Sequence, residues 1–436
     1  DYEEAFALAV MLALLLASRD AFYRRSSLLA EPLTPGWVAA IVAVLGVSVW
    51  VGLFSFRHVA YADDLWWRFA ERGDVPRFLR ASAGAAIALG VVAVLRLLRN
   101  AAPQLELATP VELQRVAQLI PSIDETAAAL ALLGDKHLLL AEQGDGFLMY
   151  GVSGRSWIAL GDPFGDEVAR RDLVWRFREA ADVHGGWPVF YEVSAHHLPL
   201  YIDLGLTLLK MGEEAIVPLS TFALEGGARR GLRRTQKDLQ KAGATFEIVP
   251  VEGVAALLPE LRAISDEWLG AKATREKGFS LGRFDTAYLS RFPHAIVRIN
   301  GRIVAFANLW TGSGRELSVD LMRYSNDAPR AVMEYLFIEL MLWGRANHFE
   351  RMSLGMAPLS GLNPRTLAPR WNRLGGLLYR HGEHFYNFRG LRAYKEKFDP
   401  TWEPRYLATP AGLALPRVLT NVTSLISGGI TGLFAK

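Results

Sequence analysis

The segment "HLLLAEQGDGFLMYGVSGRSWIALGDPFG", residues 137–165, holds three short apolar runs that are separated by glycine-containing turns. Runs of this length, bounded by Gly, Asp and Ser, are typical of an antiparallel meander. The following residues, 166–185, repeat apolar side chains at helical spacing, and "WPVFYEV" (187–193) again has the composition of a strand, with two further strand candidates before Pro218. The order of strands, helix and strand predicts an α/β unit built on one sheet.

The same order returns later in the chain, after a basic segment. It comprises a strand (245–250), a helix (254–270), three strands (294–299, 302–310 and 316–322), a helix (329–349) and a strand (351–356). We therefore predict two similar α/β units about 150 residues apart, although no residue identity between them is evident.

The composition bounds what the protein can do. A chain of 436 residues is too long for one ordinary domain, and 51% of its residues are hydrophobic, which fits a membrane part joined to a soluble part. The absence of cysteine excludes disulfides, thiolate nucleophiles and cysteine-based metal sites. Because the net charge is only +3, an anion-binding surface must come from local clusters of Lys and Arg.

Three apolar segments precede residue 100, at 5–18, 37–56 and 81–98. The second is close to the ~20 residues that cross a bilayer. Arginines follow the first and third segments, which places both of these ends on the cytoplasmic side. The basic loop 57–80 between the last two reads as an interfacial amphipathic helix anchored by Trp66 and Trp67. We expect about three spans within 1–100, and, since the chain starts at Asp1, a piece of a longer membrane protein.

Asp320 is the unusual residue of "ELSVDLMRYSNDAP" (316–329). Leu317, Val319 and Leu321 alternate with polar or larger residues, as in a strand, and Asp320 lies among them with Arg323 three residues on. The pair is either a structural ion pair on the solvent face or a functional pair. A carboxylate beside apolar side chains could hold an ammonium or act as a base, and a guanidinium could bind phosphate or an oxyanion.

The segment "GARRGLRRTQKDLQKAG" (227–243) predicts a strongly basic helix. Arg229, Arg233, Lys237 and Lys241 form an i, i+4 ladder, with Arg230 and Arg234 beside it. Like charges at this spacing destabilise a helix by roughly 0.2–0.5 kcal/mol per pair, a cost that a bound polyanion relieves. A solvated basic face and a surface for anionic lipid are the alternatives.

Several longer segments resemble the bacterial phosphatidylglycerol lysyltransferases, known as multiple peptide resistance factors. The similar segments are "FSFRHVAYADDLWWRFA", "ALGDPFG", "KGFSLGRFD", "SVDLMRY", "LGMAPLSGL" and "FYNFRGLRAYKEKFDPTWEPRYL". The resemblance implies transmembrane helices followed by tandem α/β domains of the acyl-CoA N-acyltransferase-like (GNAT) fold. The implied parts are membrane spans (1–100), a first GNAT-like subdomain (101–220), a second with the basic linking helix (221–410) and a C-terminal tail (411–436).

The implied activity moves an amino acid, most often lysine, from aminoacyl-tRNA to a glycerol hydroxyl of phosphatidylglycerol in the bacterial cytoplasmic membrane. The resemblance implies no cofactor and no metal, a catalytic domain facing the cytoplasm, and flippase spans that precede this chain. It leaves open alanine as cargo and a homo-oligomeric state. Asp320 and Arg323 match the family's catalytic "DLMR", and Lys395 is our candidate for a phosphate or the tRNA 3′ end. Arg389, Ser360 and Gly355 are further candidates for substrate binding.

Other classes of protein fit the sequence less well. An acyl-CoA transferase needs a pyrophosphate loop of the type Gln/Arg-x-x-Gly-x-Gly/Ala, and the chain has no clear match. Glu192 with His196 and His197 suggests a metal site, but a further ligand at useful spacing is missing, so we predict none. A membrane-tethered module that binds tRNA or lipid without catalysis needs the basic helix but not Asp320 and Arg323.

Overall fold

The computed structural model describes residues 2–18, 105–272, 276, 278–362 and 388–427. The first of these ranges forms helix α1 (Tyr2–Ala17), which coincides with the first predicted span. Within the described residues, no helix combines the length and the apolar character that a bilayer crossing requires. The other two predicted spans and the interfacial loop 57–80 lie outside the described residues.

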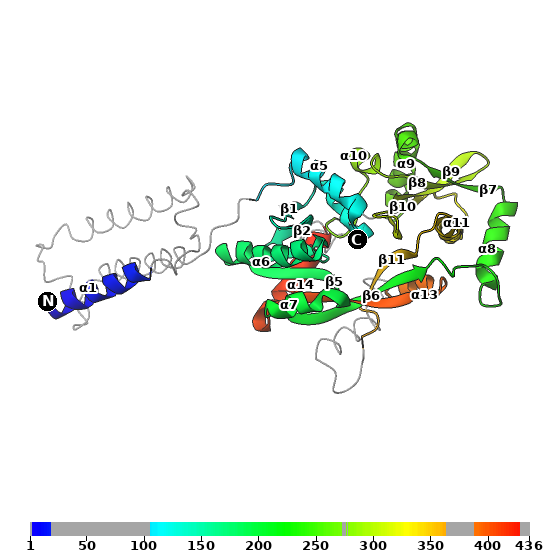
Figure 1. The fold of residues 1–436 in the computed structure, drawn as a ribbon. Helices are drawn as coiled ribbons and strands as arrows, with labels where there is room; N and C mark the ends of the chain where they lie inside the picture. Colours follow the sequence, from blue (N-terminus) through cyan, green and yellow to red (C-terminus); the bar gives the residue numbers. More distant parts are fainter. Residues whose placement is uncertain (1, 19–104, 273–275, 277, 363–387, 428–436) are drawn as a thin grey trace, which may run out of the picture. The chain divides into compact units, whose positions relative to one another are not determined.

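One twelve-stranded sheet organises the chain from Leu105 on (Figure 1). Its strands follow the order β1-β2-β3-β5-β12-β6-β11-β10-β9-β8-β7, and β4 pairs with β2 off this path. The strands are β1 (His137–Leu140), β2 (Gly146–Ser153), β3 (Ser156–Leu160), β4 (Phe164–Gly165), β5 (Trp187–Ser194), β6 (Thr207–Pro218), β7 (Ala244–Val249), β8 (His294–Ile299), β9 (Arg302–Trp310), β10 (Glu316–Tyr324), β11 (Arg351–Pro358) and β12 (Thr401–Thr409).

Helices connect and cover these strands. They are α5 (Pro110–Leu119), η4 (Ile120–Ser122), η5 (Thr126–Leu133), α6 (Glu167–Val183), η6 (Ala195–His197), α7 (Leu198–Asp203), α8 (Arg230–Lys241), α9 (Val251–Lys272), α10 (Thr286–Leu289), α11 (Val332–Ala346), α13 (Phe388–Glu396), η8 (Gly412–Ala414) and α14 (Leu415–Ser427). In Figure 1, α8 lies at the end of the sheet beside β7, and α14 lies near β2 and β3 at the other end.

Most of the predicted elements are confirmed. The segment 137–165 forms the predicted meander, α6 follows it, and β5 is parallel to β3. The second round also has its meander (β8, β9 and β10), its helix (α11) and its parallel strand (β11). The prediction of two strands between β5 and Pro218 was wrong, because the short helix α7 occupies the first part and one long strand, β6, the rest.

The two halves of the sheet exchange their last strands. β6 follows β5 in the chain but pairs with β11, whereas β12, which follows β11, pairs with β5. β6 and β12 pair with each other along their whole length in between. The centre of the sheet therefore depends on both halves of the sequence, and residues from β5, β6, β11 and β12 can share one site there.

The sequence pattern of β10 is broken by a bulge. Its pairing with β9 shifts register between Val319 and Met322. Leu317 and Val319 pack into the apolar cluster that contains α11, whereas Leu321 packs into the cluster that contains η5. The strict alternation predicted for Leu317, Val319 and Leu321 was therefore wrong, because an extra residue moves the following side chain to the other face.

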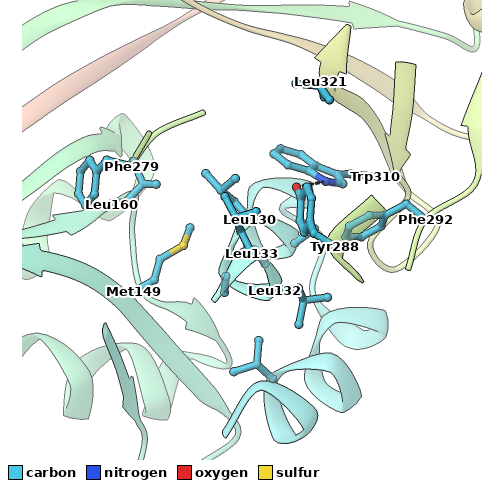
Figure 2. Close-up of a cluster of buried hydrophobic side chains, with 14 of the residues drawn as sticks. Leu130, Leu132, Leu133, Met149, Leu160, Phe279, Tyr288, Phe292, Trp310 and Leu321 are labelled. Atoms are coloured by element: carbon cyan, nitrogen blue, oxygen red, sulfur yellow. Dashed lines mark hydrogen bonds between the residues drawn. The ribbon is translucent and has the colours of Figure 1, made fainter. Parts of the chain in front are cut away.

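The cluster on the η5 face is shown in Figure 2. Leu130, Leu132 and Leu133 of η5 lie there together with aromatic side chains of α10 and β9. η5 has eight residues, seven of them buried, although 3₁₀ helices longer than three or four residues are uncommon. This apolar cluster packs against β10, where it includes Leu321.

Candidate active site

The Asp320 carboxylate is held by two donors from the segment that precedes β8. The Gly282 N–H donates to Oδ1 at 2.8 Å, and the Tyr288 hydroxyl donates to Oδ2 at 2.9 Å. The Trp310 Nε1–H donates in turn to the Tyr288 oxygen at 3.1 Å, a contact drawn in Figure 2. Because the Tyr288 oxygen accepts from Trp310, its own proton points at Asp320, and both carboxylate oxygens have a fixed direction.

Gly282 is needed for this contact. A Cβ atom added there would lie 1.7 Å from Asp320 Oδ2, which is far inside van der Waals contact. The close approach of the backbone amide to the carboxylate therefore requires that position 282 carry no side chain. The motif "KGFSLGRFD" contains this glycine, but nothing in the sequence indicated its partner.

Burial raises the pKa of the Asp320 carboxyl above its ordinary value. The hydrogen bonds from Gly282 and Tyr288 act in the opposite direction, as do the charges of Lys136 and Arg323. The pKa of Tyr288 is raised well above its usual value by burial and by the neighbouring carboxylate, so its hydroxyl stays a proton donor. A carboxylate with a raised pKa at a fixed position is able to act as a base.

Arg323 does not form an ion pair with Asp320 in the described residues. Its guanidinium donates to Glu276 Oε2 at 2.9 Å and to the Met322 carbonyl at 2.9 Å, and it stacks over the Trp268 ring at 4.3 Å. Its Nε–H is buried and has no acceptor in the part of the chain that the structure describes. The sequence alternative of a simple surface Asp–Arg pair is therefore wrong, because Asp320 and Arg323 each have other partners.

A second group of buried charges lies where the halves of the sheet exchange strands. Glu192 is at the irregularity of the β5–β12 pairing and has φ 68°, a left-handed conformation that is costly for a non-glycine residue. Arg405 Nε donates to Glu214 Oε2 at 2.7 Å, and the Ser353 hydroxyl donates to the same carboxylate. Burial and the charge of Glu214 raise the pKa of Glu192 to about 7.

Lys395 belongs to this second group. It lies in the last turn of α13, where the sequence alternative was an exposed charge at a helix start; that alternative was wrong, because only 6% of Lys395 is exposed. Its Nζ donates to the carbonyls of Gly355 and Met356 at 2.8 and 2.9 Å. Burial lowers the pKa of Lys395 to about 8, although Glu214 and Glu192 oppose this.

The other predicted substrate-binding residues differ in their surroundings. Gly355 has φ 76° at an irregularity of β11, next to the Lys395 ammonium. Ser360 is fully buried, donates to the Ala357 carbonyl and accepts from the Glu213 amide, so it stabilises the turn after β11. Arg389 lies in the first turn of α13, but its side chain is outside the described residues.

The histidine pair forms ordinary local contacts. His197 Nδ1 lies 3.1 Å from Ser194 Oγ and 3.4 Å from Asp162 Oδ2. Asp162 also accepts from the Tyr201 hydroxyl at 2.6 Å, which makes it a structural anchor of "GDPFG". In the residues that the structure describes, no group of His, Asp and Glu side chains is arranged to hold a metal ion.

The basic helix has a different exposed face from the one predicted. Arg229 binds the Lys397 carbonyl and Asp399, and Arg233 binds the carbonyls of Leu224 and Gly226. Both therefore attach α8 to the protein, while Leu232 and Leu239 are buried beneath it. The basic residues that are exposed are Arg230, Arg234, Lys237 and Lys241.

These four residues, the α8 stripe, lie on one side of the helix. At about 100° per residue, their positions fall within roughly 60° of each other around the helix axis. Of the i, i+4 ladder from Arg229 to Lys241, Lys237 and Lys241 belong to the stripe, whereas Arg229 and Arg233 contact the protein. The stripe is a straight row of cations, a geometry suited to a phosphate backbone.

The chain is similar to proteins of known family. The model of the family described as phosphatidylglycerol lysyltransferase, C-terminal, matches residues 117–409. The phosphatidylglycerol lysyltransferase of Bacillus subtilis (strain 168) is 38% identical over 299 residues, which are 68% of this chain and 35% of that protein. The chain thus spans about a third of the length of the curated relatives that it matches.

Two solved structures align with this chain over nearly all of their own length. The structure of L-PGS from Bacillus licheniformis is 35% identical, has a TM-score of 0.67 and covers 75% of this chain and 99% of its own. A C-terminal domain of the DUF2156 type from Agrobacterium fabrum is 44% identical, with a TM-score of 0.67 and coverage of 73% and 98%. The described part of this chain has the GNAT-like fold that the sequence predicts.

Proposed function

This chain belongs to the phosphatidylglycerol lysyltransferase family, and we propose that it transfers lysine from aminoacyl-tRNA to a glycerol hydroxyl of phosphatidylglycerol. The observation that supports a catalytic role, and not only binding, is the partly buried Asp320 carboxylate with one donor on each oxygen. A module that only binds tRNA or lipid has no use for a carboxylate of raised pKa in this environment, because removing a charge from water costs stability.

The reaction exchanges one ester for another. The lipid hydroxyl oxygen attacks the carbonyl carbon of the aminoacyl group, and the bond from that carbon to the tRNA ribose oxygen breaks. The proton of the lipid hydroxyl passes to Asp320 and from there to the departing ribose oxygen, so that charge and atoms balance. Because one ester replaces another of similar energy, the step needs no nucleotide, and positioning and proton transfer supply the rate.

Arg323 is the group that we assign to the negative charge developing on the carbonyl oxygen. The terminal nitrogens donate one hydrogen bond each, to Glu276 and to the Met322 carbonyl, and each keeps a second N–H that can donate to substrate. The stacking on Trp268 keeps the guanidinium plane fixed. A donor held in advance at the site of developing charge is worth more than one that must reorganise.

The tRNA is the partner that we assign to the α8 stripe, and Lys395 is our candidate for its 3′ end or for a lipid phosphate. We place the enzyme in the bacterial cytoplasmic membrane with the sheet on the cytoplasmic side, because one substrate is a membrane lipid and the other is a cytoplasmic RNA. Lysine is the cargo that the relatives' names suggest.

The test is a transfer assay with the full chain in phosphatidylglycerol-containing vesicles. Radiolabelled lysyl-tRNA and alanyl-tRNA are supplied in parallel, and labelled lipid is separated by thin-layer chromatography. We expect labelled lipid from lysyl-tRNA. Label only from alanyl-tRNA would replace lysine with alanine as cargo, and transfer from an acyl-CoA but from neither tRNA would reject the proposed reaction.

A further inference from the structure

Lys136 is a buried cation close to the Asp320 site. It lies between η5 and β1, and its side chain is 1% exposed. Its Nζ contacts Asp135 Oδ1 at 2.6 Å. Lysine is almost never buried to this extent unless it is paired, and burying an ion pair gains little stability compared with apolar side chains of the same size. A role besides stability is therefore worth seeking.

The ion pair of Lys136 leads directly to the Asp320 site. The other oxygen of Asp135, Oδ2, lies 3.7 Å from a terminal nitrogen of Arg283. Arg283 follows Gly282, whose N–H is one of the two donors to Asp320. The pair Lys136–Asp135 thus contacts the residue next to the amide that orients the carboxylate.

The charge of Lys136 also acts on Asp320. Two cations lower the pKa of this carboxyl against the effect of burial, and Lys136 does so more than Arg323. Asp320 in turn raises the pKa of Lys136, although burial lowers it overall. The remaining groups around the carboxylate are neutral: the Gly282 amide, the Tyr288 hydroxyl and, behind it, the Trp310 indole.

The acidic groups nearby already have their own cations. Asp135 pairs with Lys136 and lies near Arg283, while Glu276 pairs with Arg323. Lys136 and Arg323 therefore each have a directly bonded carboxylate. Lys136 differs in that its ion pair also reaches Arg283, the residue beside the Gly282 amide that donates to Asp320.

We propose that Lys136, held by Asp135, is a positioning residue that keeps the Asp320 carboxylate ionised and oriented during the transfer. This inference rests on the proposed function, in which Asp320 accepts a proton. Lys136 touches no substrate in this account and acts only through Asp320. If it acts in this way, removing its charge must change the pH at which Asp320 becomes protonated.

The experiment compares wild type with Lys136→Met and Lys136→Arg in the full chain. The transfer rate is measured as kcat/KM from pH 5 to 9, together with the melting temperature. Because activity requires ionised Asp320, we expect Lys136→Met to move the acidic limb to higher pH by about one unit, the size typical of a nearby opposite charge. Lys136→Arg, which keeps the cation, should leave the limb near its wild-type position. Arg298→Gln, which removes a cation paired with Glu247 at the far end of the sheet, is the matched control.

A second variant and a second readout keep the test decisive. If Lys136→Met does not fold, the double variant Asp135→Asn with Lys136→Met removes both charges of the pair together. It should displace the limb in the same direction but by less, because loss of the Asp135 anion by itself lowers the pKa of Asp320. The titration of Asp320 is also followed by ¹³C carboxyl NMR of aspartate-labelled protein, with the resonance assigned by its disappearance in Asp320→Asn. This readout needs no turnover, so it still decides the role of Lys136 if the wild type shows no transfer and the proposed function fails. An unchanged midpoint with a lowered melting temperature would show that Lys136 is only structural.

Discussion

The Asp320 site and the α8 stripe are both charged, but they are built in opposite ways. At the site, each charged side chain is at least partly buried and has a named partner, as with Arg323 and Glu276 at 2.9 Å. In the α8 stripe, the cations are exposed, and Arg234 lies 3.4 Å from Asp238 with both side chains largely in solvent. Buried charges with fixed partners can control a reaction, whereas exposed charges control affinity through the ionic atmosphere.

Because the partners of Asp320 are fixed, a small change of side chain beside it should have a large effect on the transfer rate. Gly282→Ala places a Cβ against the Asp320 carboxylate, so it must displace the base. We expect the single-turnover rate to fall by roughly 10²-fold, as a misplacement of about 1 Å typically causes. Gly278→Ala is the matched control, since its Cβ would meet nothing within 4 Å in the same segment. Equal rates for the two variants would show that the amide contact does not matter for transfer.

Arg323→Lys should have the next largest effect. A lysine cannot bind Glu276 and the Met322 carbonyl, stack on Trp268 and also leave one donor free. We expect the rate to fall by roughly 10- to 100-fold, the kinetic equivalent of about 1.5–3 kcal/mol for a hydrogen bond to a charged group. Measurement of kcat and KM separately tests the assignment, because a change confined to KM would place Arg323 in substrate binding.

The effect of Asp320 on stability should be opposite to its effect on rate. The pKa of Asp320 is raised in the folded protein, so its contribution to stability is fully present at low pH and is lost as pH rises through the raised pKa. At pH 7 the ionised carboxylate therefore costs stability, and Asp320→Asn removes that cost. Its melting temperature should equal or exceed that of wild type at pH 7, and the difference should shrink towards about pH 4, near the ordinary pKa of aspartate. A lower melting temperature at pH 7 would mean that the ionised carboxylate stabilises the fold.

The smallest effect is expected for the α8 stripe. Replacing Arg230, Arg234 and Lys237 by Ala should raise the KM for tRNA and leave single-turnover transfer at saturating tRNA nearly unchanged. It should also flatten the salt dependence, by close to one unit of log–log slope for each phosphate that the variant no longer binds. Arg233→Ala is the control, since this residue binds backbone carbonyls. An unchanged salt slope in the triple variant would contradict tRNA binding on this face.

Local patterns predicted the elements of the fold well. The meander of 137–165, the helices α6 and α11 and the parallel strands β5 and β11 follow from periodicity and turn residues, because these depend on neighbours in the chain. The exchange of β6 and β12 did not follow from the sequence, since strand partners more than a hundred residues apart leave no local signal. The 3₁₀ helix η5 was missed because "TAAALALL" has no polar face to give it a period.

The site was predictable only in part, and for the same reason. Asp320 stood out as a carboxylate among apolar neighbours, and its environment supports a functional role. Lys136 and Gly282 did not stand out, because a lysine or a glycine in a turn is ordinary until its distant partner is known. The positive charge of α8 was evident from the sequence. That Arg233 is bound to the protein was not, because its acceptors are carbonyls of the preceding loop.

Single-turnover transfer by Asp320→Asn tests the central claim most directly. The purified variant, in excess over labelled lysyl-tRNA, is mixed with phosphatidylglycerol vesicles, and labelled lipid is followed over time. Wild type is assayed in the same way, and the melting temperatures of both proteins show that both are folded. The account predicts a rate lower by roughly 10²–10⁴-fold, the typical effect of removing a positioned proton-transfer group. A folded Asp320→Asn protein that transfers lysine at a rate close to that of wild type would contradict it.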